Sequence, residues 1–243
     1  MPGFIELKDV RKIYRMGEVE IKAVDGINFS IERGEFVVIV GPSGAGKTTV
    51  LNILGGMDQA TSGEVWVNDN NIAEYSAKAL TKYRRDAIGF VFQFHQLLPE
   101  FTALENIMIP ALIAGVSSRE ATAHALEILN FMGLAERASH KPNELSGGEK
   151  QRVAIATALA SDREYVVMDE PTSGLDYKHM KEVALCLKQL KELGKSVFVI
   201  THDVELIYHC CTYVVHIEAG KVINQYAIDK STHTLLRDYF LLQ

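Results

Sequence analysis

The residues Gly41-Pro42-Ser43-Gly44-Ala45-Gly46-Lys47-Thr48-Thr49 decide which fold this chain can form. They follow a short apolar run, Phe36 to Val40, and precede apolar residues at helical spacing from Val50 to Leu54. This order predicts a buried strand, a glycine-rich loop and a helix. Glycines let successive backbone N–H groups converge on phosphate oxygens, and the positive end of the helix dipole favours the same anion. The pattern therefore predicts a phosphate-binding loop in an α/β protein.

The side chains of this loop indicate what it binds. Lys47 can reach the terminal phosphates of a nucleotide, and the Thr48 hydroxyl is suited to ligate Mg²⁺. A metal at this place needs a carboxylate, and the apolar run Tyr165 to Met168 predicts a buried strand that ends at Asp169-Glu170. Asp169 is suited to the Mg²⁺ shell, whereas Glu170 can polarise the attacking water. Taken alone, the pair could equally be the polar turn after a strand.

The segment Leu145-Ser146-Gly147-Gly148-Glu149 predicts a helix start. Ser146 and Glu149 have the spacing of a capping box, and apolar residues continue along one face of the helix. Capping does not explain two glycines in the first turn, each unfavourable in a helix by about 1 kcal/mol relative to Ala. The close approach of a phosphate held by another chain would explain them.

These motifs resemble, in order and over essentially the whole chain, the nucleotide-binding domains of ATP-binding cassette (ABC) transporters. Residues 41–49 resemble the Walker A loop, residues 145–149 the family signature, residues 165–170 the Walker B strand with its catalytic glutamate, and residues 173–176 the D-loop. The resemblance implies ATP and Mg²⁺ as cofactors. It implies catalytic roles for Lys47, Glu170 and His202, and metal ligation by Thr48, Gln93 and Asp169. The nucleotide contacts that it implies are Tyr14, Gly41, Ser43, Gly44, Ala45, Gly46, Lys47, Thr48, Thr49, Gln93, Ser146, Gly147, Gly148, Glu149 and Asp176.

Three of these residues have simpler explanations. Tyr14, expected to stack on adenine, could be an ordinary aromatic residue of a strand. Gln93, which matches the Q-loop glutamine, could only satisfy backbone groups at the end of a strand. His202, which matches the switch histidine, could be an ordinary histidine after the apolar run that precedes it.

Composition narrows the function. The chain has 243 residues, 47% of them hydrophobic, and carries 25 Lys and Arg against 31 Asp and Glu, a formal net charge of −6. No basic stripe favours nucleic acid, so nucleic acid is not expected as a partner.

The apolar stretch Asn106 to Val116 contains Pro110 and is shorter than the roughly 20 residues that cross a bilayer. Residues 1–12 lack a secretory signal pattern, and Cys186, Cys210 and Cys211 lack metal-ligand spacing. We expect reduced thiols in a cytosolic protein.

The expected fold is an α/β P-loop NTPase (RecA-like) core with a mainly parallel sheet, an antiparallel β subdomain and an inserted α-helical subdomain. Residues 1–243 form one domain, with the core in 1–93 and 161–243 and the helical subdomain in 94–160. Alternation in residues 4–10, 24–32 and 64–68 predicts the antiparallel sheet. Ser117 and Glu120 predict a capping box, Gly133 predicts the end of that helix, and Glu218-Ala219-Gly220-Lys221 predicts a hairpin turn.

The segment after Gln93 is rich in apolar residues, namely Phe94, Leu97, Leu98, Phe101, Leu104, Ile107, Met108 and Ile109. Most of them can form the core of the helical subdomain. The others could line a groove for a cytoplasmic helix of a membrane partner, and the family resemblance implies that this edge contacts a permease. The expected location is therefore the cytoplasmic face of the membrane, where the chain is held peripherally by its permease.

The expected function is ATP binding and hydrolysis as a subunit of an ABC transporter. Two copies would close head to tail around ATP and drive transmembrane permease subunits. Residues 89–93, 97–99 and 102–106 resemble the ATPases of macrolide exporters and lipoprotein-release complexes, which favours that type. Residues 173–177, 202–203 and 210–211 are more similar to energy-coupling-factor importer ATPases. Two alternatives therefore stay open, an importer ATPase of that type and a non-transport ABC ATPase that regulates a membrane partner.

Overall fold

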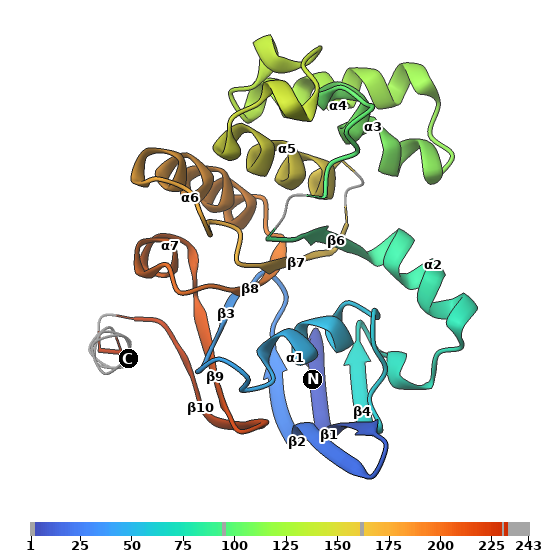
Figure 1. The fold of residues 1–243 in the computed structure, drawn as a ribbon, viewed down its shortest axis with the longest axis vertical. Coiled ribbons are helices and arrows are strands. Elements are labelled where there is room, and N and C mark those ends of the chain that lie inside the picture. The colour runs from blue at the N-terminus through green and yellow to red at the C-terminus, as the bar shows by residue number, and fades with distance from the viewer. Residues whose placement is uncertain (1–2, 94–95, 161–162, 230, 233–243) are drawn as a thin grey trace.

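A six-stranded sheet runs through the middle of the molecule (Figure 1). The computed structural model describes residues 3–93, 96–160, 163–229 and 231–232. The strand order is β10-β9-β3-β8-β7-β6, and β10 is antiparallel to β9 while the other neighbours are parallel. The strands are β3 (Phe36–Val40), β6 (Ile88–Val91), β7 (Tyr165–Asp169), β8 (Ser196–Ile200), β9 (Tyr213–Glu218) and β10 (Lys221–Ala227). The mainly parallel sheet is confirmed, as are the strands predicted before the glycine loop and before Asp169.

The predicted hairpin and antiparallel sheet are also present. Ala219 and Gly220 both have positive φ, 46° and 76°, which is the backbone that a tight two-residue hairpin requires. A second, four-stranded antiparallel sheet has the order β2-β1-β4-β5. Its strands are β1 (Ile5–Met16), β2 (Val19–Ile31), β4 (Ser62–Val67) and β5 (Asn70–Asn71).

Helices cover both sheets (Figure 1). They are α1 (Lys47–Leu54), α2 (Ala77–Ala87), α3 (Ala103–Ile113), α4 (Ser118–Phe131), α5 (Gly147–Leu159), α6 (Tyr177–Glu192) and α7 (Val204–Cys210), with short 3-10 turns at Ile72–Glu74, Ala135–Arg137 and Pro142–Glu144. The Ser117 side chain caps α4 as predicted. Glu120, however, accepts a hydrogen bond from the Ser117 hydroxyl at 2.7 Å, and the reciprocal bond to the Ser117 backbone is not formed. Gly133, at φ 67°, follows the end of α4 as predicted.

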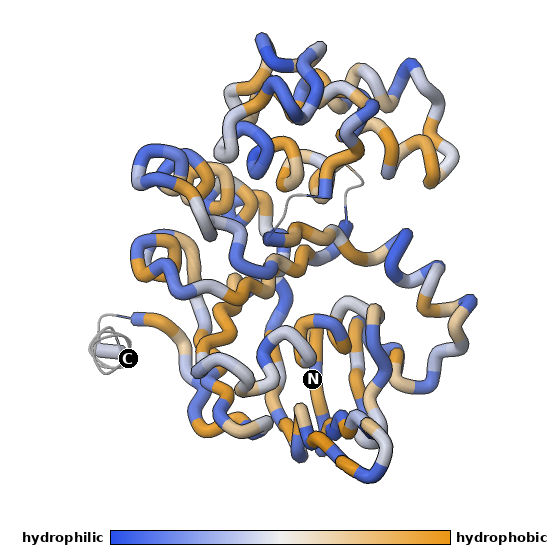
Figure 2. Tube along the Cα trace, viewed as in Figure 1, coloured by the Kyte–Doolittle hydropathy of each residue, from blue (hydrophilic) through white to orange (hydrophobic). Residues whose placement is uncertain are grey.

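Side-chain alternation in β3 divides the interior into two apolar clusters. Val37 and Ile39 face the antiparallel sheet and α1, whereas Val38 and Val40 face the helices α3 to α7. The strongly hydrophobic central strands are visible in Figure 2. Ile107 of α3 belongs to the same cluster as one face of the sheet, so the described part of the helical segment shares its core with the sheet. The division of the chain at residues 94 and 160 stays a prediction.

No helix within residues 3–93, 96–160, 163–229 and 231–232 has the length and apolar character to span a membrane. Cys186, Cys210 and Cys211 are all buried and unpaired. Burial raises the pKa of the Cys210 thiol to about 12, which keeps it protonated.

Candidate active site

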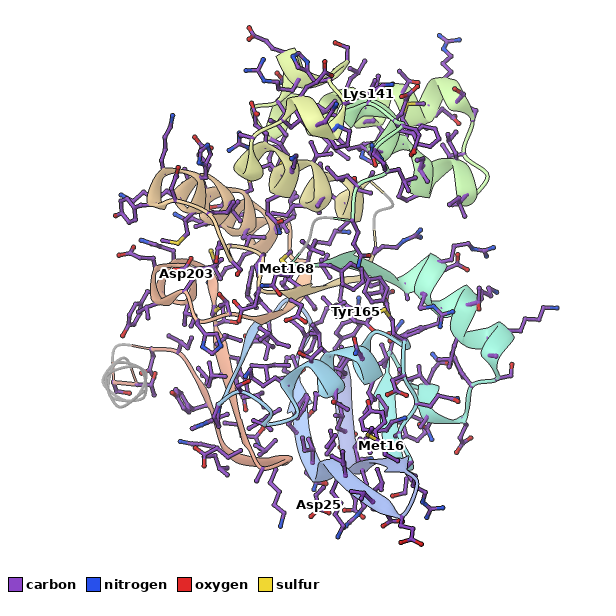
Figure 3. All side chains as sticks on the ribbon, in the orientation of Figure 1. Met16, Asp25, Lys141, Tyr165, Met168 and Asp203 are labelled. Atoms are coloured by element: carbon purple, nitrogen blue, oxygen red, sulfur yellow. The ribbon has the colours of Figure 1, made fainter. Side chains whose placement is uncertain are left out.

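Four neighbouring strands of the parallel sheet end at one cleft. β3 leads into the glycine loop, β8 into His202, β7 into Asp169 and Glu170, and β6 into Gln93. Because the carboxyl ends of parallel strands meet at the same edge of a sheet, side chains far apart in sequence converge there. The cleft has a volume of about 410 Å³ and is lined by Ile21, Lys22, Ala23, Ser43 to Thr49, Gln93, Asp169, Glu170, Ile200 and His202. Figure 3 shows Met168, the residue before Asp169, near the centre of the molecule.

The backbone conformation of the glycine loop leaves no room for a side chain at Gly46. Gly46 has φ 101°, and a Cβ there would lie 2.2 Å from the carbonyl oxygen of Ala23. Gly46 is also the N-cap of α1, and no side chain caps that helix. The first backbone N–H groups of a helix have no partners within the helix, so an anion can accept their hydrogen bonds here. The donor set therefore fits the phosphates of a nucleotide.

Lys47 lies within the loop. Its Nζ donates to the carbonyl oxygens of Gly41 at 2.7 Å and Pro42 at 2.9 Å, which leaves the third donor of the ammonium group for a phosphate oxygen. Burial lowers the pKa of Lys47, although the carboxylates of Glu170 and Asp169 oppose that shift. These hydrogen bonds fix the position of the ammonium group before any ligand arrives.

The side chains expected to hold Mg²⁺ lie together. The Thr48 hydroxyl is 3.5 Å from Asp169 Oδ2, and burial raises the pKa of Asp169. The amide nitrogen of Gln93 donates to the Ser173 hydroxyl at 3.1 Å, so the amide oxygen is left as a ligand. Among the described residues, no group of three or more His, Cys, Asp or Glu side chains could hold a metal ion. This sparse oxygen set fits Mg²⁺, which usually takes one or two protein ligands and completes its shell with phosphates and water.

Glu170 and His202 form the second part of the cleft. His202 Nε2 lies 3.4 Å from Glu170 Oε1, and burial together with the nearby Lys47 lowers the pKa of His202. A neutral His202 can still donate an N–H to the carboxylate. Glu170 has φ 49°, a backbone conformation that costs a non-glycine residue of order 1 kcal/mol or more, and its N–H donates to the Ile200 carbonyl at 2.9 Å. The strained backbone and the histidine together orient the carboxylate.

Glu170 should make folding stability depend on pH. Burial, helped by the charge of Asp169, raises its pKa from 4.5 to about 6. The folded state therefore binds this proton more tightly than the unfolded state, and the stability that it contributes is lost as pH rises from about 4.5 through about 6. We expect Glu170→Gln, which has no charge to desolvate, to raise the melting temperature of the nucleotide-free protein at pH 8 by about 3 °C, corresponding to about 1 kcal/mol.

Thermal unfolding measured at pH 4.5 and at pH 8 tests this expectation. The gain should largely disappear at the lower pH, where the carboxyl group is almost fully protonated in the folded state and about half protonated in the unfolded state. An equal gain at both values would show that the charge of Glu170 is not the cause.

Tyr14 lies beside the cleft and not in its wall. Its strand partner Ile21 lines the cleft, and the Tyr14 hydroxyl donates to Asp58 at 2.6 Å. Lys12 Nζ lies 4.9 Å from the centre of the Tyr14 ring. The ring is thus held at the β1–β2 edge, and its predicted contact with adenine stays a prediction.

The segment 145–149 does not line this cleft. The Ser146 hydroxyl accepts from the Glu149 N–H at 3.3 Å, and Glu149 accepts from the Ser146 N–H at 2.8 Å, which confirms the predicted capping box. The other oxygen of Glu149 accepts from Arg137 at 2.8 Å. Burial opposes these bonds, but Arg137 and Ser146 outweigh it and lower the pKa of Glu149 to about 2. Both oxygens of Glu149 are therefore used within the chain, where they fix the start of α5.

The two glycines of this segment have different surroundings. A Cβ at Gly148 would lie 2.5–2.7 Å from three atoms of His179, which is too close for any real contact. A Cβ at Gly147 would only touch Leu175 at 3.5 Å, an ordinary contact. Packing within the chain already excludes a side chain at Gly148, and the predicted contact of Gly148 with a phosphate held by another chain stays a prediction. At Gly147, by contrast, no contact in the described part of the chain requires a residue without a side chain.

Asp176 begins α6 and is exposed. Its Oδ1 accepts from the backbone N–H of His179 at 3.0 Å and lies 2.8 Å from His179 Nδ1. The first of these hydrogen bonds, with the second reinforcing it, lowers the pKa of Asp176. The structure therefore brings residues 43–49 of the Walker A loop, the two acids, Gln93 and His202 into one cleft. It leaves Gly41, Tyr14, Asp176 and residues 145–149 outside the lining of that cleft.

Three residues in or beside the cleft were not predicted from the sequence. Ile21 and Lys22 line the cleft from β2, and Asp58 holds the Tyr14 hydroxyl. Lys22 and Asp58 belong to no recognisable spacing pattern, because their places depend on how the antiparallel sheet packs beside α1. Ile21 lies in β2 but before the alternation of residues 24–32 from which that strand is predicted.

The glycine loop, the acids at the end of β7 and the parallel sheet define a P-loop NTPase. Residues 24–173 match the ABC transporter family. The lipoprotein-releasing system ATP-binding protein LolD of Bacteroides fragilis is 49% identical over 204 residues, 84% of this chain and 94% of LolD. The chain therefore belongs to the ABC transporter family, as its ATP-binding part.

Two solved structures resemble this one. A dimeric post-hydrolysis state of the ATP-binding cassette MJ0796 from Methanocaldococcus jannaschii, bound to ADP and Pi, has a TM-score of 0.85 and 42% identity over 93% of this chain and 99% of that one. The structure of cbiO1 from Clostridium perfringens, part of the transporter complex cbiONQ, has a TM-score of 0.85 and 27% identity over 100% of this chain and 94% of that one. The fold is thus shared with both of these cassettes.

Proposed function

We propose that this chain is the ATP-hydrolysing subunit of an ABC transporter of the exporter or lipoprotein-release type. The observation that carries the proposal is the convergence of Lys47, the Thr48–Asp169 pair and the Glu170–His202 pair in one cleft. The test is an ATPase assay of the purified chain, with and without its membrane partner. A chain that neither binds nor hydrolyses ATP in either form would contradict the proposal.

The residues of the cleft have separate tasks in this reaction. Lys47 and the first N–H groups of α1 bind the β- and γ-phosphates, and Thr48, Asp169 and Gln93 would hold Mg²⁺. The metal, when bound, offsets negative charge on the phosphates. Glu170 accepts a proton from the attacking water, and His202 keeps the Glu170 carboxylate oriented through its Nε2–H. A carboxylate with a pKa of about 6 is ionised at neutral pH and is still basic enough for this step.

The complete site needs a second copy of the chain. In this arrangement Ser146, Gly147 and Gly148 of one copy meet the γ-phosphate bound at Lys47 of the other, with Asp176 along the interface. The start of α5 supports it, because a capped helix N-terminus with an exposed glycine offers N–H donors to an anion. The dimeric MJ0796 cassette, bound to ADP and Pi, supports the same assembly.

An apolar groove on the other side of β6 is suited to the permease. Its two connected parts share Phe90, Pro110 and Thr157, and Ile109 and Ile113 of α3 also line it. Of the apolar run after Gln93, Ile107 lies in the core and Leu97, Leu104 and Met108 pack partly buried against it. Leu98 and Phe101 are exposed, and Phe94 lies outside the described residues. Arg84 and Arg163 add positive charge to the groove, whereas the charge of Arg85 is offset by its ion pair with Asp86. An amphipathic cytoplasmic helix of a membrane subunit, with an acidic side, fits this lining.

We expect Ile113→Glu to remove the permease from the purified complex. The Ile113 side chain is 63% exposed on the groove, so a charge there would be desolvated by an apolar partner helix, at a cost of a few kcal/mol. ATP binding by the isolated chain should be unchanged. Co-purification from detergent-solubilised membranes measures the effect, and Ile223→Glu on β10, also exposed, is the matched control. Equal retention of the membrane subunit in both variants would contradict the assigned groove.

The resemblance to LolD supports a direction of transport and a location for this chain. Identity is 49% to LolD and 27% to cbiO1, which favours lipoprotein release or export over the importer alternative. The chain is then peripheral on the cytoplasmic face of the membrane, held there by its permease. The proposed organisation keeps residues 94–160 as the helical subdomain that connects the permease groove to the start of α5. Identification of the membrane protein that co-purifies with the chain tests direction, location and the remaining regulatory alternative together.

A further inference from the structure

His179 lies between two segments that the proposed function brings to the second copy. It belongs to the first turn of α6, and its ring lies against Gly148 in the first turn of α5. A Cβ at Gly148 would be 2.5 Å from Cδ2, 2.7 Å from Cβ and 2.7 Å from Cγ of His179. The absence of a side chain at position 148 is thus what allows α5 and α6 to approach at this point.

The same histidine holds Asp176. Its backbone N–H and its ring Nδ1 both reach Asp176 Oδ1, at 3.0 and 2.8 Å. Because a carboxylate oxygen can only accept, Nδ1 must carry a proton in this arrangement. One side chain therefore fixes the carboxylate of Asp176 and fills the space above Gly148 at the same time.

Other contacts join the same two helices. Arg152 of α5 forms an ion pair with Glu182 of α6, one turn beyond His179. Leu175, next to Asp176, is the nearest neighbour of the position where a Cβ of Gly147 would lie, at 3.5 Å. These contacts join α5 to α6 and to the residue before Asp176, and the His179 ring both packs on Gly148 and lies at hydrogen-bond distance from Asp176.

We propose that His179 is a positioning residue that holds Ser146, Gly147 and Asp176 as one rigid edge, which meets the ATP-bound face of a second copy. The inference rests on the proposed head-to-tail dimer. Loss of the ring lets α5 and Asp176 move independently, so each must be ordered again when two copies close. His179 does not contact the nucleotide cleft, and its effect should therefore appear in dimer formation and not in ATP binding by one chain.

The first experiment measures ATP-dependent dimerisation in the Glu170→Gln background by analytical ultracentrifugation. We expect His179→Ala to weaken the dimer about tenfold while the affinity of the monomer for ATP changes less than twofold. His179→Asn keeps a donor near the Nδ1 position and should lie between the two. His209→Ala removes a histidine from the exposed face of α7 and is the matched control.

Two results would overturn the inference in different ways. If the Glu170→Gln parent does not dimerise with ATP, the proposed dimer and the role of His179 both fail. If the parent dimerises and His179→Ala dimerises equally well, only the role of His179 fails. An equal loss in His179→Ala and His179→Asn would refute the part assigned to the hydrogen bond with Asp176.

A second experiment tests the contact itself through melting temperatures of the nucleotide-free chain. Gly148→Ala alone should lower the melting temperature by about 3 °C, because the new methyl group overlaps the ring. In the His179→Ala background the loss should be smaller, because the ring atoms Cγ and Cδ2 are gone, although the Cβ of residue 179 still lies 2.7 Å from the new methyl group. An equal loss in both backgrounds would show that the His179 ring does not exclude the side chain.

Discussion

We expect Glu170→Gln to reduce ATP turnover by about 10²- to 10⁴-fold, the range that a positioned general base contributes. Gln keeps the size of the side chain and can still contact His202, but it cannot accept the proton of the attacking water. The phosphate contacts of Lys47 and the first turn of α1 are untouched, so ATP should bind with an affinity near that of the wild type. Because the γ-phosphate persists, the ATP-bound dimer should accumulate.

Phosphate release measures the loss of ATP turnover. Light scattering after size-exclusion chromatography measures the accumulation of the ATP-bound dimer. Glu164→Gln is the control, since Glu164 precedes β7 and lies at the opposite end of the strand that leads to Glu170. The control should turn over ATP normally and show no trapped dimer. Undiminished turnover in Glu170→Gln would refute the role assigned to this carboxylate.

The sequence predicts the cleft well because each predicted residue of the cleft follows a strand that is recognisable locally, and one geometric rule brings the strand ends together. Each of Lys47, Gln93, Glu170 and His202 follows an apolar run that is recognisable as a strand. Parallel strands place their carboxyl ends at one edge, so four separate local predictions become one site. The β9–β10 hairpin and the capping box at Ser146 are predicted for the same reason, since their bonds join residues close in sequence.

Contacts between segments distant in sequence are where prediction fails. The two glycines at positions 147 and 148 look equivalent in the sequence, yet only Gly148 is packed under His179, a residue 31 positions later. Tyr14 likewise depends on Asp58, which is 44 residues away and belongs to no motif. Such neighbours are set by how α5 packs on α6 and how β1 lies beside α1. The spacing of residues in a single sequence does not reveal which distant segments come into contact.

The largest effect should come from mixing two inactive variants. Lys47→Ala loses the ammonium group that contacts the phosphates, and Ser146→Arg places a bulky charged side chain where the second copy must close. Each variant alone should be inactive, because every site of its dimer contains the altered residue. In a mixed dimer, the Lys47 of the Ser146→Arg chain faces the intact Ser146 of the Lys47→Ala chain. We expect equal mixing to restore up to about a quarter of wild-type ATPase activity, since half of the dimers are mixed and each has one complete site.

This recovery separates a shared site from one built within a single chain. If residues 145–149 acted on the nucleotide of their own chain, the Ser146→Arg chain would keep a damaged site in every pairing, and mixing would restore nothing. The structure makes the shared site the better expectation, because the segment does not line the cleft that holds Lys47. Mixed dimers isolated by two affinity tags, with circular dichroism to show that both variants fold, provide the measurement. Absence of any activity in correctly folded mixed dimers would mean that the signature segment does not complete the site of a second copy.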